Sequence, residues 1–232
     1  MNRETLITKL KKSGKGSKSA RLLFYRYKEI IDPFPYRRYL RKNKCVFVHI
    51  PKTAGTAVLK ALGHSGPRDH STYREFLKSN PVRFNNYFKF GFVRNPYSRF
   101  ISTYKYLKGG GNNSVRDQFY KELIDSECPT VNEFVSYVIN NELYQADPLL
   151  WPQHMYLCNP LGEVMVDFVG QYESLEIDFE VIAKSLGLDN KLEKVNVSSD
   201  KDFLTISEKS LKRLTDIYKK DFYTFGYREN SY

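Results

Sequence analysis

Residues 45–58 read Cys45-Val46-Phe47-Val48-His49-Ile50-Pro51-Lys52-Thr53-Ala54-Gly55-Thr56-Ala57-Val58. The apolar start predicts a strand, the Pro-Lys-Thr-Ala-Gly-Thr centre predicts a tight turn, and the continuation predicts a helix. In such a unit the loop N–H groups and the positive end of the helix dipole converge on one point, which favours an anion. Lys52 adds a positive charge there, and Thr53 and Thr56 add hydroxyl donors. The stretch therefore predicts a site for a phosphate-like group.

This turn differs from the common nucleotide-binding loop, G-x-x-x-x-G-K-[ST]. The lysine of this chain precedes the glycine, and Gly-Lys-Ser/Thr occurs nowhere in the sequence. The same residues would also suit an ordinary strand-to-helix turn or a divergent P-loop kinase. The kinase hypothesis would use Asp167, which follows an apolar run, as a magnesium-binding acid at a strand end.

A second strand–turn–helix unit is predicted over residues 90–104. Asn95 is a favourable N-cap, and Pro96 would occupy the first helical position, where its missing N–H costs nothing. Arg94 then stands at the carboxyl end of the strand, and Ser102 lies about two turns into the helix. An arginine fork with a hydroxyl suits a second phosphate, whereas the alternative is an Arg94–carboxylate pair and a tolerated helix serine.

Together and in this order, the two units resemble the sulfotransferases that use 3′-phosphoadenosine-5′-phosphosulfate (PAPS). In that family the first loop holds the 5′-phosphosulfate, and an Arg with a Ser eight positions later holds the 3′-phosphate. The resemblance implies PAPS as the sulfuryl donor, with no metal required. It also implies that Lys52 is both a donor-binding and a catalytic residue. The residues that match the family's donor site are Lys52, Thr53, Ala54, Gly55, Thr56, Arg94 and Ser102.

Three later segments, residues 151–160, 166–175 and 214–227, resemble the carbohydrate branch of that family, which includes the HNK-1, chondroitin and heparan sulfate 2-O-sulfotransferases. This implies a carbohydrate or glycolipid hydroxyl as the acceptor. One departure concerns cysteine. The Golgi enzymes carry a second cysteine shortly after the position of Cys158, where this chain has Leu161.

The three cysteines give an odd count without a disulfide framework, which favours a reducing compartment. The chain has neither an apolar run of membrane-spanning length nor the pattern of a secretory signal. We therefore expect a bacterial-type, cytoplasmic member of the family.

Charge is concentrated in residues 1–44, which carry fourteen Lys or Arg against three acidic residues. This segment accounts for the whole formal net charge of +11. Its apolar residues are spaced as faces of basic helices, which can bind an anionic membrane surface and would place the protein on the inner membrane face. Packing of residues such as Tyr36 and Tyr39 on the rest of the chain is the alternative. A non-enzymatic polyanion-binding adaptor also remains open, but no nucleic-acid-binding motif accompanies the basic segment.

The acceptor hydroxyl needs a base, and His70 is our choice. Its usual pKa leaves a histidine mostly neutral at working pH, and its position between the two anion units resembles that of the histidine in bacterial family members. Asp69 or Glu75 could orient the ring. His154 is the second candidate and His64 the third. The four histidines and three cysteines show no metal-binding spacing, so we predict no metal site.

The alternation of strands and helices predicts an α/β fold, a P-loop-like three-layer arrangement with a central parallel sheet flanked by helices. We expect a domain over residues 45–232, preceded by the basic segment 1–44. Strands are expected near 45–50, 88–93 and 163–169. Helices are expected near 56–63, 98–107, 115–126, 130–140, 176–187 and 206–221. Residues 109–113, Gly-Gly-Gly-Asn-Asn, are expected to form a surface connection or a mobile lid.

Overall fold

The computed structural model describes residues 33–189, 192 and 206–229. Its sheet consists of β1 (Cys45–Val48), β2 (Phe88–Val93) and β3 (Phe168–Gln171), all parallel and in the order β1-β2-β3. All four residues of β1 are buried, as expected for a parallel strand covered on both faces. Together with the flanking helices, the sheet confirms the predicted α/β class.

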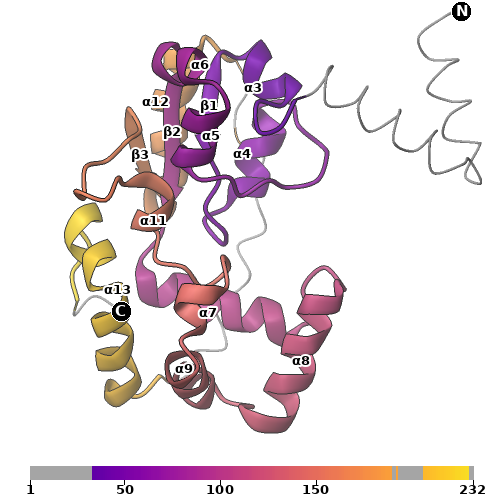
Figure 1. Cartoon of the computed structure of the whole chain (residues 1–232), viewed down its shortest axis with the longest axis vertical. Helices are drawn as coiled ribbons and strands as arrows, with labels where there is room; N and C mark the ends of the chain where they lie inside the picture. Colours follow the sequence, from indigo (N-terminus) through magenta and orange to yellow (C-terminus); the bar gives the residue numbers. More distant parts are fainter. Residues whose placement is uncertain (1–32, 190–191, 193–205, 230–232) are drawn as a thin grey trace, which may run out of the picture.

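Helices surround the sheet and extend beyond one end of it (Figure 1). Those expected from the sequence are all present, with ends that differ by a few residues. The helices are α3 (Arg38–Lys42), α4 (Gly55–Ala61), α5 (Tyr73–Ser79), α6 (Pro81–Asn86), α7 (Pro96–Lys108), α8 (Val115–Glu127), α9 (Val131–Asn140), α10 (Leu143–Ala146), α11 (His154–Leu157), α12 (Leu175–Leu186) and α13 (Glu208–Phe225), with a 3₁₀ turn η1 (Tyr172–Ser174).

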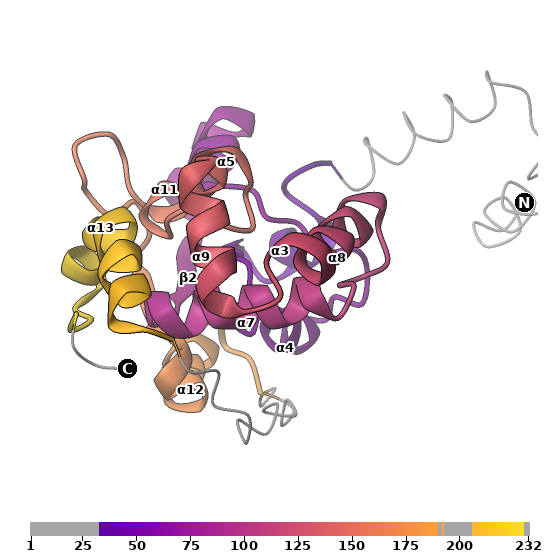
Figure 2. The ribbon, with the colours of Figure 1, turned by 90° about the horizontal axis from the view of Figure 1, so that it is seen from below.

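The chain folds into two packed regions that meet at the carboxyl ends of the strands. Figure 2 shows α4 and α12 on one side of the sheet and α5 with α11 on the other. This first region has a core that includes Val46, Phe90 and Phe92. In the second region, α7, α8, α9 and α13 pack around Phe100 and Phe134. Burying each of these phenylalanines stabilises the fold by about 1.5–3 kcal/mol.

The predicted strand over residues 163–169 is wrong in its bounds, because β3 begins only at Phe168. Asp167 therefore precedes the strand. Its Oδ2 accepts a hydrogen bond from Lys89 N at 2.8 Å and pairs with Lys89 Nζ at 2.9 Å, beside the start of β2. This carboxylate lies at the amino-terminal edge of the sheet, opposite the edge where Arg94 follows β2. The kinase hypothesis therefore loses the acid that it would place at the carboxyl ends of the strands.

Part of the basic N-terminal segment belongs to the packed fold. Tyr36, Tyr39 and Leu40 are buried in the core of the first region, and Tyr36 Oη donates to Phe76 O at 3.1 Å. Residues 1–32, with the predicted basic helices and their contact with a membrane surface, lie outside the described residues. Within the described residues, none of the helices has the length and apolar character needed to cross a membrane.

Candidate active site

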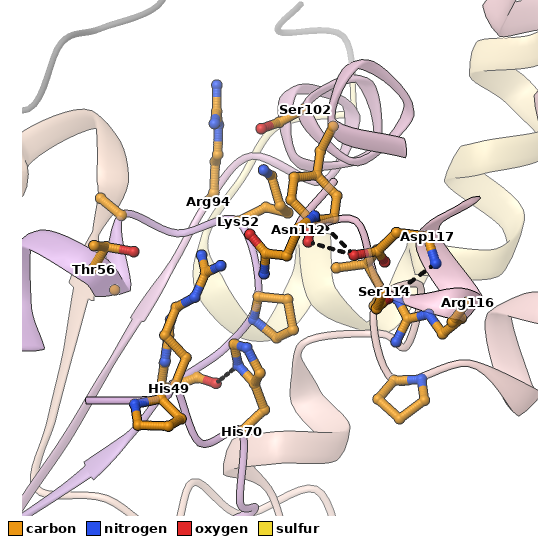
Figure 3. A pocket seen from close by; sticks show the side chains of 18 of the residues that line it. His49, Lys52, Thr56, His70, Arg94, Ser102, Asn112, Ser114, Arg116 and Asp117 are labelled. Atoms are coloured by element: carbon orange, nitrogen blue, oxygen red, sulfur yellow. Dashed lines mark hydrogen bonds between the residues drawn. The ribbon is translucent and has the colours of Figure 1, made fainter. Parts of the chain in front are cut away.

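A cavity of about 670 Å³ opens beyond the carboxyl ends of β1 and β2, where the two regions meet (Figure 3). The loop before α4, the turn after β2, one face of α7, the start of α8 and η1 contribute to its wall. This is the position at which open parallel sheets bind their ligands. The lining residues with polar or charged side chains are His49, Lys52, Thr56, Arg68, His70, Arg94, Ser102, Tyr106, Asn112, Ser114, Arg116, Asp117 and Tyr172.

The loop between β1 and α4 has an unusual backbone. Lys52 and Ala54 have φ angles of 70° and 62°, in the left-handed region that non-glycine residues rarely adopt. Thr53 between them is fully buried, and its Oγ1 donates to Ile50 O at 3.0 Å. The hydroxyl of Thr53 thus holds the turn together and does not line the cavity, whereas Thr56 does.

Gly55, the first residue of α4, lies directly against the ring of His49. A Cβ at position 55 would be 1.9 Å from His49 Nε2, so no side chain fits there. The His49 ring is buried beneath the loop, and burial holds its pKa well below its usual value, with His70 and Arg68 adding to this effect. The neutral ring of His49 therefore acts as a support for the loop.

The geometry around His70 fixes its tautomer. His70 Nδ1 lies 2.8 Å from His49 O (Figure 3). Because a carbonyl oxygen can only accept, Nδ1 must carry the proton, and Nε2 keeps its lone pair. Burial lowers the pKa of His70, the hydrogen bond to His49 partly opposes this, and Arg68 lowers the pKa further. His70 is therefore a neutral base at neutral pH.

Neither carboxylate expected to orient His70 contacts its ring. Asp69 Oδ1 accepts hydrogen bonds from Ser71 N at 2.9 Å and Ser71 Oγ at 2.8 Å. Glu75 forms the capping box of α5 with Thr72. Asp69 thus bonds within its own turn, and Glu75 caps the start of α5. The carbonyl of His49 orients the His70 ring instead.

Positive charge dominates the cavity. Lys52, Arg68, Arg94 and Arg116 all line it, and of the described residues in its wall Asp117 alone is acidic. Burial lowers the pKa of Lys52 to about 8, and the charges of Arg68 and Arg94 contribute to the shift. A ligand with several negative charges would relieve this repulsion.

Arg94 and Ser102 both line the cavity, and their side chains lie in the same part of the view in Figure 3. The Arg94 guanidinium lies 4.0 Å from the centre of the Tyr172 ring, and its Nε is buried with no hydrogen-bond partner among the described residues. A buried donor without a partner is costly and points to a ligand that would accept its hydrogen bond.

The backbone of Arg94 is fixed by a fully buried glutamine. Gln153 Oε1 accepts from Arg94 N at 2.9 Å, and Gln153 Nε2 donates to Arg94 O at 2.8 Å. Gln153 N in turn donates to Asp221 Oδ2 of α13 at 2.6 Å. The side chain of Gln153 therefore fixes the turn after β2, and Asp221 of α13 in turn fixes the backbone of Gln153.

His154 and His64, the second and third candidates for the base, are not part of the cavity wall. His154 Nδ1 pairs with Asp221 Oδ1 at 2.7 Å, and its backbone N donates to the same atom. His64 Nε2 lies 3.0 Å from Pro67 O. Both rings have structural partners. Among the described residues there is no group of three or more His, Cys, Asp or Glu side chains arranged to hold a metal ion.

The structure also adds residues that the sequence did not single out, above all Arg68, Tyr106, Arg116, Asp117 and Tyr172. Tyr172 lies in one of the segments that resemble the carbohydrate branch, and the other four residues belong to no recognisable motif. Tyr106 could have been found, because it lies four residues after Ser102 and therefore on the same face of α7. The other four come from loops or helix starts, which only the tertiary fold brings to the cavity.

Residues 38–228 match the model of the family described as "Sulfotransferase family". The curated relatives include carbohydrate sulfotransferase 11 of Rattus norvegicus, which is 28% identical over 65% of this chain and 49% of that protein. Carbohydrate sulfotransferase 14 of Danio rerio is 26% identical over 80% of this chain and 60% of that protein.

A third relative, carbohydrate sulfotransferase 10 of Xenopus laevis, is 25% identical over 65% of this chain and 50% of that protein. The chain thus spans about half the length of the curated relatives it matches. No solved structure gives a significant match. Because the family model covers most of the described fold and all of the cavity wall, the chain belongs to the sulfotransferase family.

Proposed function

We propose that this protein transfers the sulfuryl group of PAPS to a hydroxyl of a carbohydrate or glycolipid. One observation carries the proposal. In a chain of the sulfotransferase family, a neutral base (His70), a lysine on a tight anion loop (Lys52) and an arginine–serine pair (Arg94 and Ser102) line the same cavity.

The cavity offers two separate places for the phosphate groups of the donor. The N–H groups of the loop over residues 52–56 and the ammonium of Lys52 suit the 5′-phosphosulfate. Arg94, whose Nε has no partner among the described residues, and the hydroxyl of Ser102 suit the 3′-phosphate. The repulsion among Lys52, Arg68 and Arg94 in the free protein would be relieved by a ligand of this charge.

The residues then divide the chemistry between them. His70 Nε2 takes the proton of the acceptor hydroxyl, because the lowered pKa of His70 leaves its Nε2 lone pair unprotonated at neutral pH. Lys52 and the loop N–H groups stabilise the negative charge that develops on the leaving 5′-phosphate oxygen. Fixed donors aimed at that charge favour the transition state over the ground state.

The acceptor is a carbohydrate by analogy with the relatives, whose names describe carbohydrate sulfotransferases. Arg68 and Arg116 are close enough to His70 to lower its pKa. An acidic group on the acceptor would find its counter-charge there.

The experiment is transfer of ³⁵S from labelled PAPS to a panel of desulfated glycans and glycolipids, with wild type, His70→Ala and His64→Ala. Loss of a general base typically costs 10²–10⁴-fold in rate, so we expect about this loss for His70→Ala, with unchanged affinity for adenosine 3′,5′-bisphosphate. His64→Ala should keep most of the transfer, because its ring lies outside the cavity wall. Equal activity of all three proteins would refute the role of His70.

A further inference from the structure

The ammonium of Lys52 has an aromatic partner inside the cavity. Lys52 Nζ lies 4.2 Å from the centre of the Tyr106 ring on α7, within the range of a cation–π interaction. Figure 3 shows Lys52 pointing into the cavity between Arg94 and Asn112. The lysine proposed to bind the donor is thus already held in the absence of a ligand.

The other groups around Lys52 do not attract its charge. Burial is the main cause of the lowered pKa of Lys52. The positive charges of Arg68, in the segment before α5, and of Arg94, after β2, lower it further. His49 and His70 have lowered pKa values and are neutral at neutral pH. On α8, Arg116 is cationic, and the single carboxylate of the cavity wall, Asp117, has other partners. Among the described residues, neither a carboxylate nor a hydrogen-bond acceptor contacts Lys52 Nζ, which leaves the face of the Tyr106 ring.

The Tyr106 ring is itself fixed by Asp117. Tyr106 Oη donates to Asp117 Oδ2 at 3.1 Å, and Asn112 N donates to the same oxygen at 2.9 Å. Gly111, in the loop that precedes α8, lies against the Asp117 carboxylate and has a φ angle of 56°. A Cβ there would lie 2.6 Å from the Asp117 carboxyl group. The glycine-rich loop over residues 109–113 therefore makes room for the carboxylate that holds the ring.

We propose that Tyr106 is a positioning residue for Lys52: its ring holds the ammonium at the cavity in its charged form before the donor binds. Asp117 holds the ring, and Asn112 N donates to the same carboxylate oxygen. The proposal rests on the proposed role of Lys52 in donor binding. It assigns a function to the face of α7 that carries Ser102 and to the loop that follows this helix.

The test follows the titration of Lys52 by NMR of ¹³C-labelled lysine side chains in the ligand-free protein, with the signal assigned by its loss in Lys52→Arg. Wild type is compared with Tyr106→Phe and Tyr106→Leu. We expect the titration midpoint of Lys52 to fall by roughly half a pH unit to one pH unit in Tyr106→Leu. Leucine has no π face, so it no longer stabilises the charged form of Lys52. Tyr106→Phe keeps the ring but loses its hydrogen bond to Asp117, so its midpoint should fall less than that of Tyr106→Leu.

An isosteric ring provides a second test if Tyr106→Leu does not fold. Pentafluorophenylalanine at position 106 keeps the shape of the ring but withdraws the negative charge from its face, so the Lys52 midpoint should again fall. A wild-type midpoint with Leu or with the fluorinated ring would overturn the proposal. A shift in Tyr106→Phe as large as in Tyr106→Leu would do the same, since it would place the effect in the hydroxyl.

Because this titration uses no donor, its outcome is separate from that of the proposed function. Affinity for adenosine 3′,5′-bisphosphate at pH 8.5 gives the functional readout, and Tyr106→Leu should weaken it more than Tyr106→Phe. A bisphosphate that binds no variant, with the NMR shifts as expected, would refute the donor site but not the interaction between Tyr106 and Lys52.

Discussion

His70 is oriented by a backbone carbonyl, and this choice of partner sets its chemistry. A carboxylate beside the ring would favour the imidazolium and raise its pKa. The carbonyl of His49 fixes the same tautomer as a neutral acceptor. Burial outweighs the upward effects of this hydrogen bond and of the Asp69 charge, so the pKa of His70 stays low. A residue oriented in this way is available as a proton acceptor over a wide pH range.

The two lowered pKa values predict a bell-shaped dependence of kcat/KM on pH. The rate should rise as His70 loses its proton, with a midpoint below the usual histidine value of about 6.5. It should fall again near pH 8, where Lys52 loses its charge in the free protein. Steady-state kinetics over pH 5–10 measures both limbs.

Lys52→Arg serves as the control for the alkaline limb, because an arginine stays charged throughout this range. The variant should keep the acid limb of the profile and lose the fall near pH 8, whatever its absolute rate. An alkaline limb that persists unchanged in Lys52→Arg would show that another group titrates there.

At the scale of elements, the loop between β1 and α4 depends on the absence of a side chain at Gly55. The strained φ angles of Lys52 and Ala54 are kept by the hydrogen bond from Thr53 to Ile50 and by the buried His49 ring. A strained loop persists only where its surroundings determine it fully.

Gly55→Ala should therefore disturb the loop, because its Cβ would overlap the His49 ring. We expect a loss of about 1–3 kcal/mol in the free energy of unfolding, as for overpacking of a filled interior, and a marked loss of bisphosphate affinity. The matched control is Gly109→Ala, whose Cβ would meet only ordinary contacts at 3.4 Å or more. Denaturant unfolding and calorimetry compare the two, and equal behaviour would contradict this account of the loop.

Elements with a strong local pattern were predictable from the sequence, and elements set by tertiary contacts were not. The strands at Cys45 and Phe88 have buried apolar runs, and the helix after Asn95 has its cap and its proline. The two strand–turn–helix units are therefore present as predicted. The strand near Phe168 was placed too early, because the apolar run before Asp167 looks like a strand but lies outside the sheet. Short helices such as α5, α6 and α11 carry too few turns to show a period.

The candidate site divides in the same way. Lys52, Arg94 and Ser102 stand on predicted strand–turn–helix units, so their meeting at one edge of the sheet followed from topology. The sequence predicts Thr53 as a ligand-binding residue through its hydroxyl, whereas in the structure this hydroxyl is buried and donates to Ile50 O within the loop. Asp117 and Arg116 could not be placed, because their position depends on how α8 packs against α7.

At the scale of the whole molecule, the C-terminal helix supports the site from a distance. Asp221 of α13 is fully buried and accepts from Gln153 N, and the side chain of Gln153 bonds both backbone groups of Arg94. These hydrogen bonds join residues that are far apart in the sequence. They give segments 151–154 and 214–227 a physical role, which is to fix the turn that carries Arg94.

Gln153→Ala should loosen the turn that carries Arg94 and leave backbone groups at that turn without their partner. We expect the preference for adenosine 3′,5′-bisphosphate over AMP to fall by about tenfold or more, with a smaller change in affinity for AMP itself. Gln145→Ala, at an exposed position of α10, is the control and should behave as wild type. Equal losses for both nucleotides would mean that Gln153 supports the fold in general and not the position of Arg94.

The central claim is that the cavity has two separate phosphate sites, and calorimetric titration of the ligand-free protein tests it most directly. Adenosine 3′,5′-bisphosphate, AMP and magnesium-ATP are titrated into wild type and Arg94→Ala. We predict that the bisphosphate binds wild type most tightly and that Arg94→Ala removes about a tenfold to hundredfold advantage over AMP, as expected for charge-assisted hydrogen bonds. Tighter binding of magnesium-ATP, or a bisphosphate preference that survives in Arg94→Ala, would contradict the account.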